Sequence, residues 1–547
     1  MKYIILIIFL FLNSLNVFPQ FTRQWVAKYN GPGNSSDEAK SITVDVFGNV
    51  YVTGESTGGG TGGDYATVKY NSVGVQQWVA RYNGPGNNID KANSIVVDDS
   101  GNVYVTGGSI GSGLDYDYAT VKYNSSGVQQ WVARYNGPDN IFDYAYSIAI
   151  DNLGFIYVTG ESQRSQTGLE ITTIKYNSSG VQQWVSRYIG SLNENANSIK
   201  VDALGNVYVA GNRGNLSHTE YISLKYNSSG VQQWVAIYSG GENTFSNYSD
   251  LAIDVLGNVY VTGSSRISNL TGFDYTTVKY NSLGVQQWVA KYNGLESGPD
   301  YANSVAVDAS GNVYITGNSR GNGTNYDYAT VKYNSSGIQE WINRYNGPGN
   351  NIDQANSIAV DISGNVYVSG ESFGTGTNFD YATIKYNSSG VQQWIDRYNG
   401  TGNGYDYASS IIIDASNNVY VTGGSLEGET YWDFTTIKYS QSTGVSQILN
   451  EIPLSFSLEQ NYPNPFNPVT KIRFSLPKSS FVKLIIYDTF GRELETIFNG
   501  QVNSGFYEAD WNAVNYSSGV YFYRIEFYSE NLVSGEFTDV KKMILIK

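Results

Sequence analysis

One segment of about 53 residues recurs along most of this chain. Its tryptophan, in a Q-Q-W-V motif with slight variations, stands at Trp25, Trp78, Trp131, Trp184, Trp234, Trp288, Trp341 and Trp394. The aspartate of a D-x-x-G-N-V-Y-V motif stands at Asp45, Asp98, Asp151, Asp202, Asp254, Asp308, Asp361 and Asp414. Self-similarity at a fixed period indicates a solenoid, a propeller or another array of repeats.

Each unit carries four short strand patterns, which the second unit illustrates. Ser94–Asp98 is a short apolar run, and Asn102–Gly107 is rich in β-branched and aromatic residues. Asp117–Tyr123 and Val128–Tyr135 alternate between apolar and polar residues. Clusters of Gly, Asn, Asp and Ser bound all four patterns, and no helical periodicity is present. The unit therefore predicts four β-strands.

The connections between these strands are of two kinds. D-x-x-G-N joins the first two strands and N-S-S-G joins the last two, and both turns hardly vary. The other connections, such as Glu55–Gly63 and Pro85–Ala92, vary in sequence and length. In a four-stranded antiparallel unit the two variable connections lie on the same side. Binding residues often lie on such loops, so this side is the first place to look for a ligand site.

Four antiparallel strands repeated eight times predict an all-β protein with an eight-bladed β-propeller. The array begins with a fourth-strand pattern at Gln24–Asn30 and ends with a third-strand pattern at Lys438–Tyr439. We expect the N-terminal strand to complete the last blade, because this leaves no sheet edge exposed. Gly444–Leu449 is an alternative fourth strand, and its use would make Gln24–Asn30 surplus.

A different pattern follows the repeats, whose period stops at Ser440–Leu458. Alternating segments at Val482–Asp488, Tyr507–Trp511 and Gly519–Tyr528 precede the end of the chain at Lys541–Lys547. About seven short strands in about 90 residues predict a small immunoglobulin-like β-sandwich.

Two family resemblances rest on these motifs. The D-x-x-G-N-V-Y-V-T-G units resemble the bacterial β-propeller repeats called SBBP repeats, which implies a propeller but no common activity. The last domain resembles the type A C-terminal sorting domain of the type IX secretion system. The matching elements are Pro463–Pro465, Tyr487–Arg492, Ser518–Tyr521 and the basic end at Lys547.

The sorting-domain resemblance implies an address. It implies a Gram-negative bacterium of the Bacteroidetes–Chlorobi type, Sec export, and passage across the outer membrane by the type IX machinery as a partner. The protein would then be secreted or held at the outer-membrane surface. Met1–Gln20 reads as a signal peptide, because Lys2 precedes an apolar run, Tyr3–Leu12, that is too short to span a bilayer. We expect no transmembrane segment in the mature protein.

These patterns divide the chain into four parts. We expect a signal peptide at residues 1–20, the propeller at 21–449, a linker at 450–460 and the sorting domain at 461–547.

Composition excludes several classes of function. The chain has no cysteine, so disulfides, cysteine nucleophiles and cysteine metal sites are excluded. A formal net charge of −15 opposes binding to nucleic acid. The single histidine, His218, lies in a polar stretch that no other unit repeats, and we interpret it as an exposed loop residue rather than a catalytic base.

Two sets of carboxylates are predicted on the side with variable loops. The first set precedes the first strand: Asp37, Asp90, Asp143, Asp300, Asp353 and Asp406. The second set opens the third strand: Asp64, Asp117, Asp274, Asp327, Asp380 and Asp433, with Glu220 in one unit. Oxygen ligands of this kind suit Ca²⁺, and paired carboxylates can hydrolyse glycosides. Their recurrence in nearly every unit favours a third role, in which each carboxylate accepts backbone hydrogen bonds and fixes a loop.

Other repeated features have structural interpretations. Gly59–Ala66 fits a calcium-binding nonapeptide once, without the tandem copies that such motifs need. The repeated Trp and Tyr residues could stack on sugars, but their strict strand positions favour packing between blades.

The sequence thus predicts an exported, non-enzymatic module that binds or displays something at the cell surface, without a resident cofactor. A glycan or surface polysaccharide is the candidate ligand, and Ca²⁺ is the candidate ion at the carboxylates. Two alternatives stay open: a polysaccharide-active enzyme that uses these carboxylates, and a structural or adhesive surface protein.

Overall fold

The computed structural model describes residues 21–547 except 112, 114, 166–167, 216–217, 241–244, 267–271, 297, 428–430, 442–444, 450, 514–515 and 529–536. The expected signal peptide, Met1–Gln20, lies outside the described residues. The described chain contains strands and turns, and it has no helix long and apolar enough to cross a membrane. The all-β prediction is therefore confirmed.

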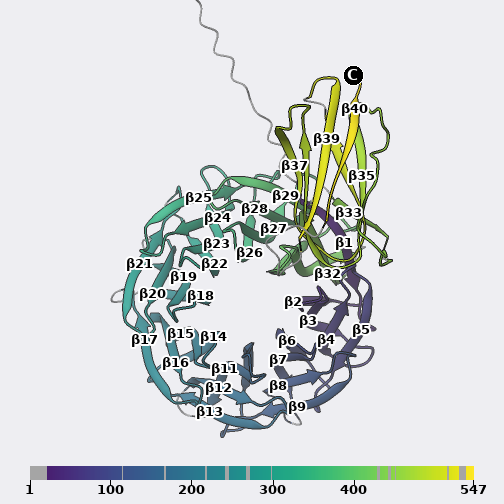
Figure 1. Ribbon diagram of the computed structural model, residues 1–547. Coiled ribbons are helices and arrows are strands. Elements are labelled where there is room, and N and C mark those ends of the chain that lie inside the picture. The colour runs from purple at the N-terminus through teal and green to yellow at the C-terminus, as the bar shows by residue number, and fades with distance from the viewer. Residues whose placement is uncertain are drawn as a thin grey trace, which may run out of the picture. The chain divides into compact units, whose positions relative to one another are not determined.

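The repeats form a ring of four-stranded antiparallel blades (Figure 1). The first blade contains β2 (Asp37–Val44), β3 (Val50–Thr57), β4 (Gly63–Tyr70) and β5 (Gln76–Tyr82), paired in that order. β2 lies on the inner side of the ring and β5 on the outer side.

Four further blades have the same strand order. They are β6 (Asp90–Val97), β7 (Val103–Ile110), β8 (Tyr116–Tyr123) and β9 (Gln129–Tyr135); β10 (Asp143–Ile150), β11 (Ile156–Arg164), β12 (Gly168–Tyr176) and β13 (Gln182–Tyr188); β22 (Asp300–Val307), β23 (Val313–Arg320), β24 (Tyr326–Tyr333) and β25 (Gln339–Tyr345); and β26 (Asp353–Val360), β27 (Val366–Phe373), β28 (Phe379–Tyr386) and β29 (Gln392–Tyr398).

The middle of the array departs from this pattern, because one parallel bridge, Thr219↔Phe245, joins two blades into an eight-stranded sheet. Its strands are β14 (Asn193–Val201), β15 (Val207–Asn215), β16 (His218–Tyr226), β17 (Gln232–Tyr238), β18 (Phe245–Ile253), β19 (Val259–Arg266), β20 (Asp274–Tyr280) and β21 (Gln286–Tyr292). This is the stretch in which the repeat sequence diverges most.

The last blade takes its outer strand from the other end of the array. β30 (Asp406–Ile413), β31 (Val419–Glu427) and β32 (Tyr431–Gln441) pair in sequence, and β1 (Phe21–Tyr29) lies beside β32. Trp25 of β1 packs on Tyr420 and Tyr70, each with ring centroids 6.2 Å apart. The expected closure by Gln24–Asn30 is therefore present.

The alternative closing strand belongs elsewhere. Val445–Leu449 is β33, and it pairs with β38 of the second unit, with Val445 opposite Ala509. The segment lacks the tryptophan that β1 packs against its neighbours, whereas Val445 packs against the core of the second unit. The chain divides after Ser440, so the expected propeller boundary at residue 449 and the linker at 450–460 are corrected.

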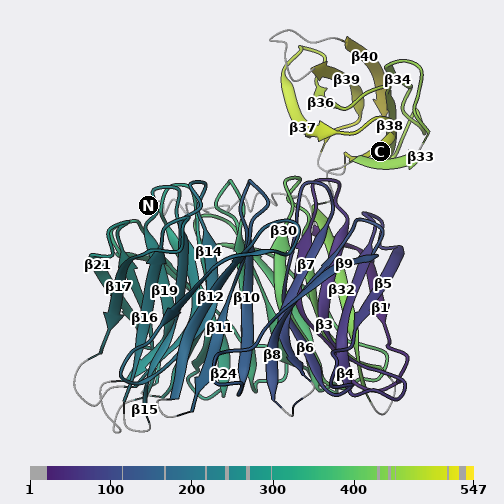
Figure 2. The same ribbon diagram turned by 90° about the horizontal axis from the view of Figure 1, so that it is seen from below.

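The strands of the ring run between its two ends, where connections join them (Figure 2). The repeated turns form as the sequence predicts. In the first D-x-x-G-N turn the Gly48 N–H donates to the Asp45 carbonyl at 3.0 Å, and Gly48 has a φ of 75°. In the first N-S-V-G turn the Gly74 N–H donates to the Asn71 carbonyl at 2.9 Å. Both turns join neighbouring strands at the same end of the blade, opposite the variable loops.

The core of the ring lies between blades. The Trp78 ring lies 6.1 Å from Tyr51 of its own blade and 6.3 Å from Tyr123 of the next. Its Nε1–H donates to the Ser125 carbonyl, 3.0 Å away in the next blade. The equivalent bond runs from Trp131 to Ser178 at 3.1 Å. The interpretation of the repeated tryptophans as packing between blades is confirmed.

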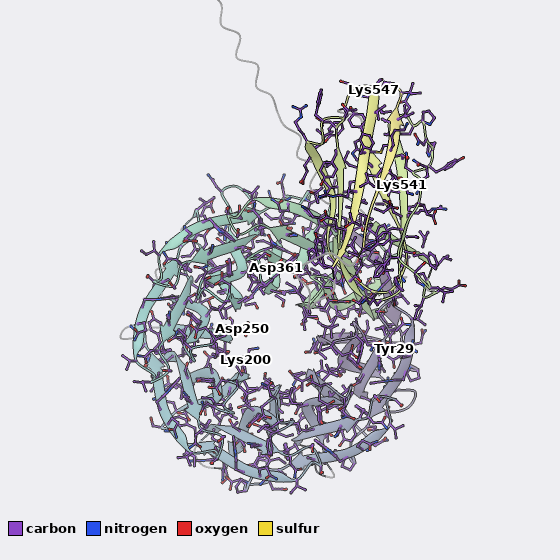
Figure 3. The ribbon with its side chains drawn as sticks, viewed as in Figure 1. Tyr29, Lys200, Asp250, Asp361, Lys541 and Lys547 are labelled. Carbon is purple, nitrogen blue, oxygen red and sulfur yellow. The ribbon has the colours of Figure 1, made fainter. Side chains whose placement is uncertain are left out.

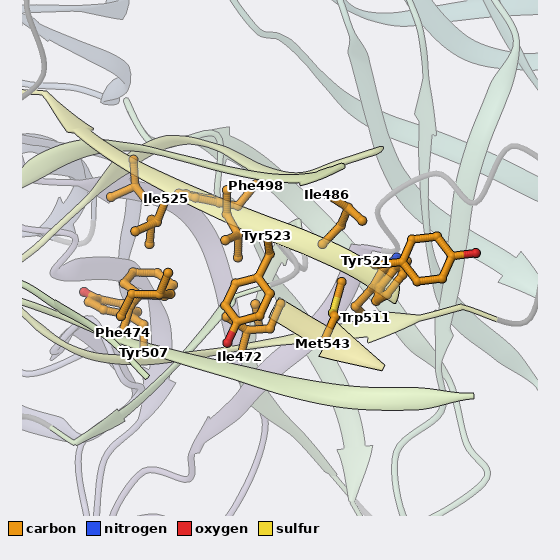
Figure 4. Close-up of a cluster of buried hydrophobic side chains, with 14 of the residues drawn as sticks. Ile472, Phe474, Ile486, Phe498, Tyr507, Trp511, Tyr521, Tyr523, Ile525 and Met543 are labelled. Carbon is orange, nitrogen blue, oxygen red and sulfur yellow. The ribbon is translucent and has the colours of Figure 1, made fainter. Parts of the chain in front are cut away.

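The second unit folds as two four-stranded sheets around its own core (Figure 4). One sheet has the order β33, β38 (Gly505–Asn512), β35 (Val469–Leu476), β34 (Ser457–Leu458), and the other β37 (Glu493–Val502), β36 (Ser480–Tyr487), β39 (Gly519–Tyr528), β40 (Phe537–Leu545). Trp511 is 1% exposed and packs 5.4 Å from Phe466 and 5.5 Å from Tyr521. Phe466 thereby anchors the proline-rich segment to this core.

The turn glycines offer a test of packing between blades. Gly127 has a φ of +79°, and a Cβ there would lie 2.6 Å from the Trp78 ring, whereas Gly154 has a φ of +78° and nothing within 4 Å. Gly154→Ala should cost about 1–2 kcal/mol from backbone strain alone. Gly127→Ala should cost about 1–3 kcal/mol more, because it also displaces Trp78. Urea titration followed by tryptophan fluorescence measures both, and equal losses would contradict the proposed contact.

Candidate functional site

The first carboxylate set accepts hydrogen bonds from the backbone. Asp37 is 0% exposed, and its Oδ2 accepts the Gly31 N–H at 2.6 Å while its Oδ1 accepts the Thr57 N–H at 3.1 Å. The equivalent glycine N–H lies 2.6–2.7 Å from the carboxylates of Asp90, Asp143, Asp300, Asp353 and Asp406. Asp37, Asp90, Asp300, Asp353 and Asp406 also accept a backbone N–H of the neighbouring strand. These five carboxylates therefore tie the loop before their strand to that neighbour, which is the loop-fixing role favoured above.

Burial shifts the titration of this set. Removal from water raises the pKa of Asp37 and, with the same main cause, of Asp90, Asp300, Asp353 and Asp406. It raises the pKa of Asp143 to about 6, and the nearby carboxylates of Asp117 and Glu170 act in the same direction. The backbone N–H donors partly offset the effect.

The second set forms ion pairs with arginines of the outer strands. The Arg81 Nη2 lies 2.9 Å from the Asp64 Oδ2, and the other Nη donates to the Tyr29 hydroxyl, 3.0 Å away in the neighbouring blade. The same pair recurs at 2.7 Å for Arg134–Asp117, 3.0 Å for Arg344–Asp327 and 2.7 Å for Arg397–Asp380. These side chains are less than a quarter exposed, so each pair is a partly desolvated link between blades.

Sequence reasoning missed these arginines. Arg81 belongs to the repeated V-A-R-Y pattern of the outer strand, where alternation suggests a solvent-facing residue. A usable signal was present: wherever the pattern has Arg at Arg81, Arg134, Arg344 and Arg397, an aspartate stands 17 residues earlier.

Other members of the second set differ. Asp274 lies near Lys291 rather than an arginine, and burial raises its pKa. Asp433 pairs across the sheet with Ser425, in the position that Asp64 takes opposite Ser56. Glu220 lies 3.2 Å from Arg213 and 3.0 Å from the Nε2 of His218.

His218 is not the exposed loop residue that the sequence suggested. It begins β16, it pairs with Asn215 of β15, and it is only partly exposed. β15 and β16 have nine residues each, one more than the equivalent strands β3 and β4 of the first blade. This extension places the histidine in the sheet. Its carboxylate neighbour is Glu220 on the same strand, two residues away, so the two side chains share one face.

The described residues contain no group of three or more His, Cys, Asp and Glu side chains arranged to hold a metal ion. Calcium binding at the carboxylates stays a prediction. Asp37 already uses both carboxylate oxygens to accept backbone N–H groups, and one oxygen of Asp64 contacts arginine.

Comparison with known families identifies both parts of the chain. Residues 24–60, 77–115, 130–164, 287–324 and 340–379 match the β-propeller repeat model. Residues 460–537 match the secretion system C-terminal sorting domain. Both resemblances are therefore confirmed, and a type IX sorting tail implies export to the surface or the medium. No curated protein matches the chain significantly.

Several solved structures are similar at low identity. Sqt1 from Chaetomium thermophilum is 8% identical with a TM-score of 0.47, over 77% of this chain and 99% of that one. A fungal alcohol oxidase of the AA5 family is 12% identical with a TM-score of 0.40, over 82% and 96%. The polysaccharide lyase ulvan lyase, bound to an oligosaccharide, is 11% identical with a TM-score of 0.40, over 66% and 94%. These likenesses carry no argument about function.

The Arg134 link can be tested by truncation. Arg134→Ala removes the bond to Asp117 and the 2.9 Å bond to the Tyr82 hydroxyl of the neighbouring blade. It should cost about 2–3 kcal/mol, because a partly buried carboxylate loses its partner. The control is Arg320→Ala, whose partner Glu296 lies 3.3 Å away in an exposed pair, and it should cost about 0–1 kcal/mol. Equal effects in urea titration would contradict the link.

The raised pKa of Asp143 predicts a pH dependence. Its folded pKa of about 6 lies above the ordinary 3.8, so between these values the folded protein holds a proton that the unfolded chain has lost. The associated stability is present below pH 3.8 and is lost as the pH rises through 6. Asp143→Asn is neutral throughout and should lose this dependence. Urea titrations of both proteins from pH 4 to pH 8 measure it, and parallel curves would refute it.

Proposed function

We propose that this β-propeller repeat protein with a secretion sorting tail is an exported, non-enzymatic module that binds or displays a ligand outside the cell. Export is supported by the match of residues 460–537 to a sorting domain, which lies in a unit with its own core. The binding role rests on a rigid ring that presents variable loops on one side.

The proposal also includes the number of blades, the fold of the tail and the route of export. We infer eight blades, with β1 completing the last, and an immunoglobulin-like sandwich for the tail. We infer that Met1–Gln20 is a signal peptide for Sec export. The tail then directs the protein through the type IX machinery to the outer-membrane surface or the medium of a Gram-negative bacterium.

The non-enzymatic reading is supported by how the carboxylates are used. A glycosidase needs two carboxyl groups free to face a scissile bond. Asp37 and its equivalents are buried and accept backbone N–H groups, while Asp64, Asp117, Asp327 and Asp380 contact arginine. In this proposal both sets stabilise the scaffold, and the ligand is held by residues outside them.

The address is tested by dividing the chain at its structural boundary. A chain that ends at Ser440 keeps β1 to β31 and nearly all of β32, so it should fold as a ring and stay in the periplasm. The reciprocal fusion carries a signal peptide, a reporter and Gln441–Lys547, and it should deliver the reporter to the surface or the medium. Cell fractionation in a host with type IX secretion measures both.

A folded truncated chain that leaves the cell at the normal rate would refute the sorting role. Circular dichroism of the truncated chain is the control, since a ring that fails to fold would also fail to leave the cell. A second host strain without the type IX machinery should retain the fusion in the periplasm, and release there would equally refute the proposal.

A further inference from the structure

Some aromatic side chains of the ring do not repeat in every blade. Tyr144 and Tyr407 occupy the inner-strand position just before a buried alanine, where other blades carry residues such as Glu38, Lys91 and Asn195. Both tyrosines are partly exposed, and each lies between a buried aspartate and a buried alanine. Since most blades form without a tyrosine here, packing between blades does not require it.

Each of these tyrosines belongs to a cluster at a junction between two blades. The first cluster contains Tyr116, Phe142, Tyr144 and Tyr146, and the second contains Phe379, Tyr405, Tyr407 and Trp432. Three positions correspond between the clusters: the start of a third strand, the residue before the buried aspartate and the residue after it. All eight side chains are partly exposed.

The rings within each cluster pack on one another and stay partly exposed. Tyr116 and Tyr144 meet edge to face at 5.4 Å, and Phe142 and Tyr144 are parallel at 5.7 Å. In the second cluster Tyr407 meets Trp432 edge to face at 6.1 Å. The Trp432 Nε1–H donates to the Tyr405 carbonyl at 2.9 Å, which holds the indole in place.

Carboxylates accompany both clusters. The Tyr146 hydroxyl donates to the Glu161 Oε1 at 2.8 Å, and the Tyr405 hydroxyl donates to the Glu371 Oε2 at 2.5 Å. Burial raises the pKa of both glutamates. Glu55 occupies the same strand position in a third blade, and the blades of β14 to β25 carry Asn212, Ser264 and Asn318 there. The carboxylates are thus confined to one side of the ring.

Polar residues of the blades between the clusters connect them. Tyr407 hydrogen-bonds to Glu38, and Lys91 lies 3.1 Å from Glu55. Tyr116 and Tyr144 lie near Lys91. The inner strands β26, β30, β2, β6 and β10 succeed one another around the ring, and Figure 1 shows β2 and β6 side by side on its inner side. The two clusters and these polar residues form a continuous strip over five consecutive blades, which we call the aromatic arc.

We propose that the aromatic arc binds a neutral carbohydrate polymer, with sugar rings against the partly exposed aromatic rings and sugar hydroxyl groups on the partly exposed Glu38, Glu55 and Lys91. Aromatic rings present apolar faces of the size of a sugar ring, and a few placed polar groups fix orientation. Lys40 lies 2.8 Å from Glu38 and is the second cation of the arc beside Lys91. The four carboxylates Glu38, Glu55, Glu161 and Glu371 outnumber these two cations, which disfavours sulfated and uronate polymers. This inference rests on the proposed binding role and deepens it by naming the ligand class.

The opposite side of the ring supplies a matched control. Tyr301 occupies the same inner-strand position as Tyr144 and lies 6.2 Å from Tyr326, another partly exposed ring. The residue across the sheet from Tyr301 is Asn318 instead of a glutamate. Figure 3 labels Lys200 and Asp250, which lie on inner strands of this side. The Ser304 hydroxyl of the next blade donates to the Asp250 Oδ2 at 2.9 Å.

The test compares two double variants of the full chain. One carries Tyr144→Ala and Tyr407→Ala, and the control carries Tyr301→Ala and Tyr326→Ala. The probes are laminarin, xyloglucan and galactomannan as neutral polymers, with alginate and chondroitin sulfate as anionic ones, by affinity electrophoresis and calorimetry. We expect at least one neutral polymer to bind, the arc variant to lose about tenfold or more in affinity, and the control to change less than about twofold.

Several outcomes overturn the inference. It falls if the folded protein binds none of the neutral polymers, if it binds only the anionic ones, or if both double variants weaken binding equally. Retention of a protein partner without any polymer would also refute the carbohydrate assignment. The export experiment does not depend on these results. If the fusion is exported and the truncated chain is retained, the proposed export stands even when the carbohydrate assignment fails.

Discussion

Contacts from each blade to the next hold this protein together. The Trp78 indole donates to the Ser125 carbonyl at 3.0 Å, and the Tyr65 hydroxyl donates to the Ala119 carbonyl at 3.1 Å, both in the following blade. Arg81 reaches in the other direction, to the Tyr29 hydroxyl. In a chain without cysteine, these contacts and the packing around them take the place of covalent links. A blade alone would expose the faces that make them, so the repeats depend on a complete ring.

This dependence explains why the ends of the array are placed as they are. The last blade lacks an outer strand of its own, and β1 supplies one that has the tryptophan and tyrosine of the repeat. Trp25 packs on Tyr420, and Tyr29 lies 5.4 Å from Phe434. Val445–Leu449 has neither aromatic residue, and its alternation fits the second unit better. Closure therefore follows from side chains that must be present between every pair of blades.

Periodicity made most of the fold predictable. The spacing of tryptophans such as Trp78 and Trp131 fixed the period, and the alternating segments matched the observed strands closely. The loop-fixing role of Asp37 was also predictable, because a residue present in nearly every blade has a repeated task. The arginine partners were missed, since alternation in V-A-R-Y cannot show that Arg81 turns toward Asp64 in the adjacent strand.

The aromatic arc was missed for a different reason. Tyr144 and Tyr407 are 263 residues apart in sequence, and only closure of the ring places their blades within the same consecutive five. Their positions also resemble ordinary strand alternation. The sequence alone could not separate a tyrosine that is buried between blades, such as Tyr65, from one that stays partly exposed.

The inner strand shows how such a scaffold can carry a site without loss of stability. In β10, Asp143 and Ala145 are buried and hold the strand, while Tyr144 and Tyr146 alternate with them and stay partly exposed. The free energy of folding depends mainly on the buried positions, because apolar area removed from water and satisfied polar groups dominate it. The exposed positions can therefore change from Lys91 in one blade to Tyr144 in the next while the backbone stays the same. Residues that bind a ligand can therefore occupy these positions on one side of the ring, because packing does not require the same residue there in every blade.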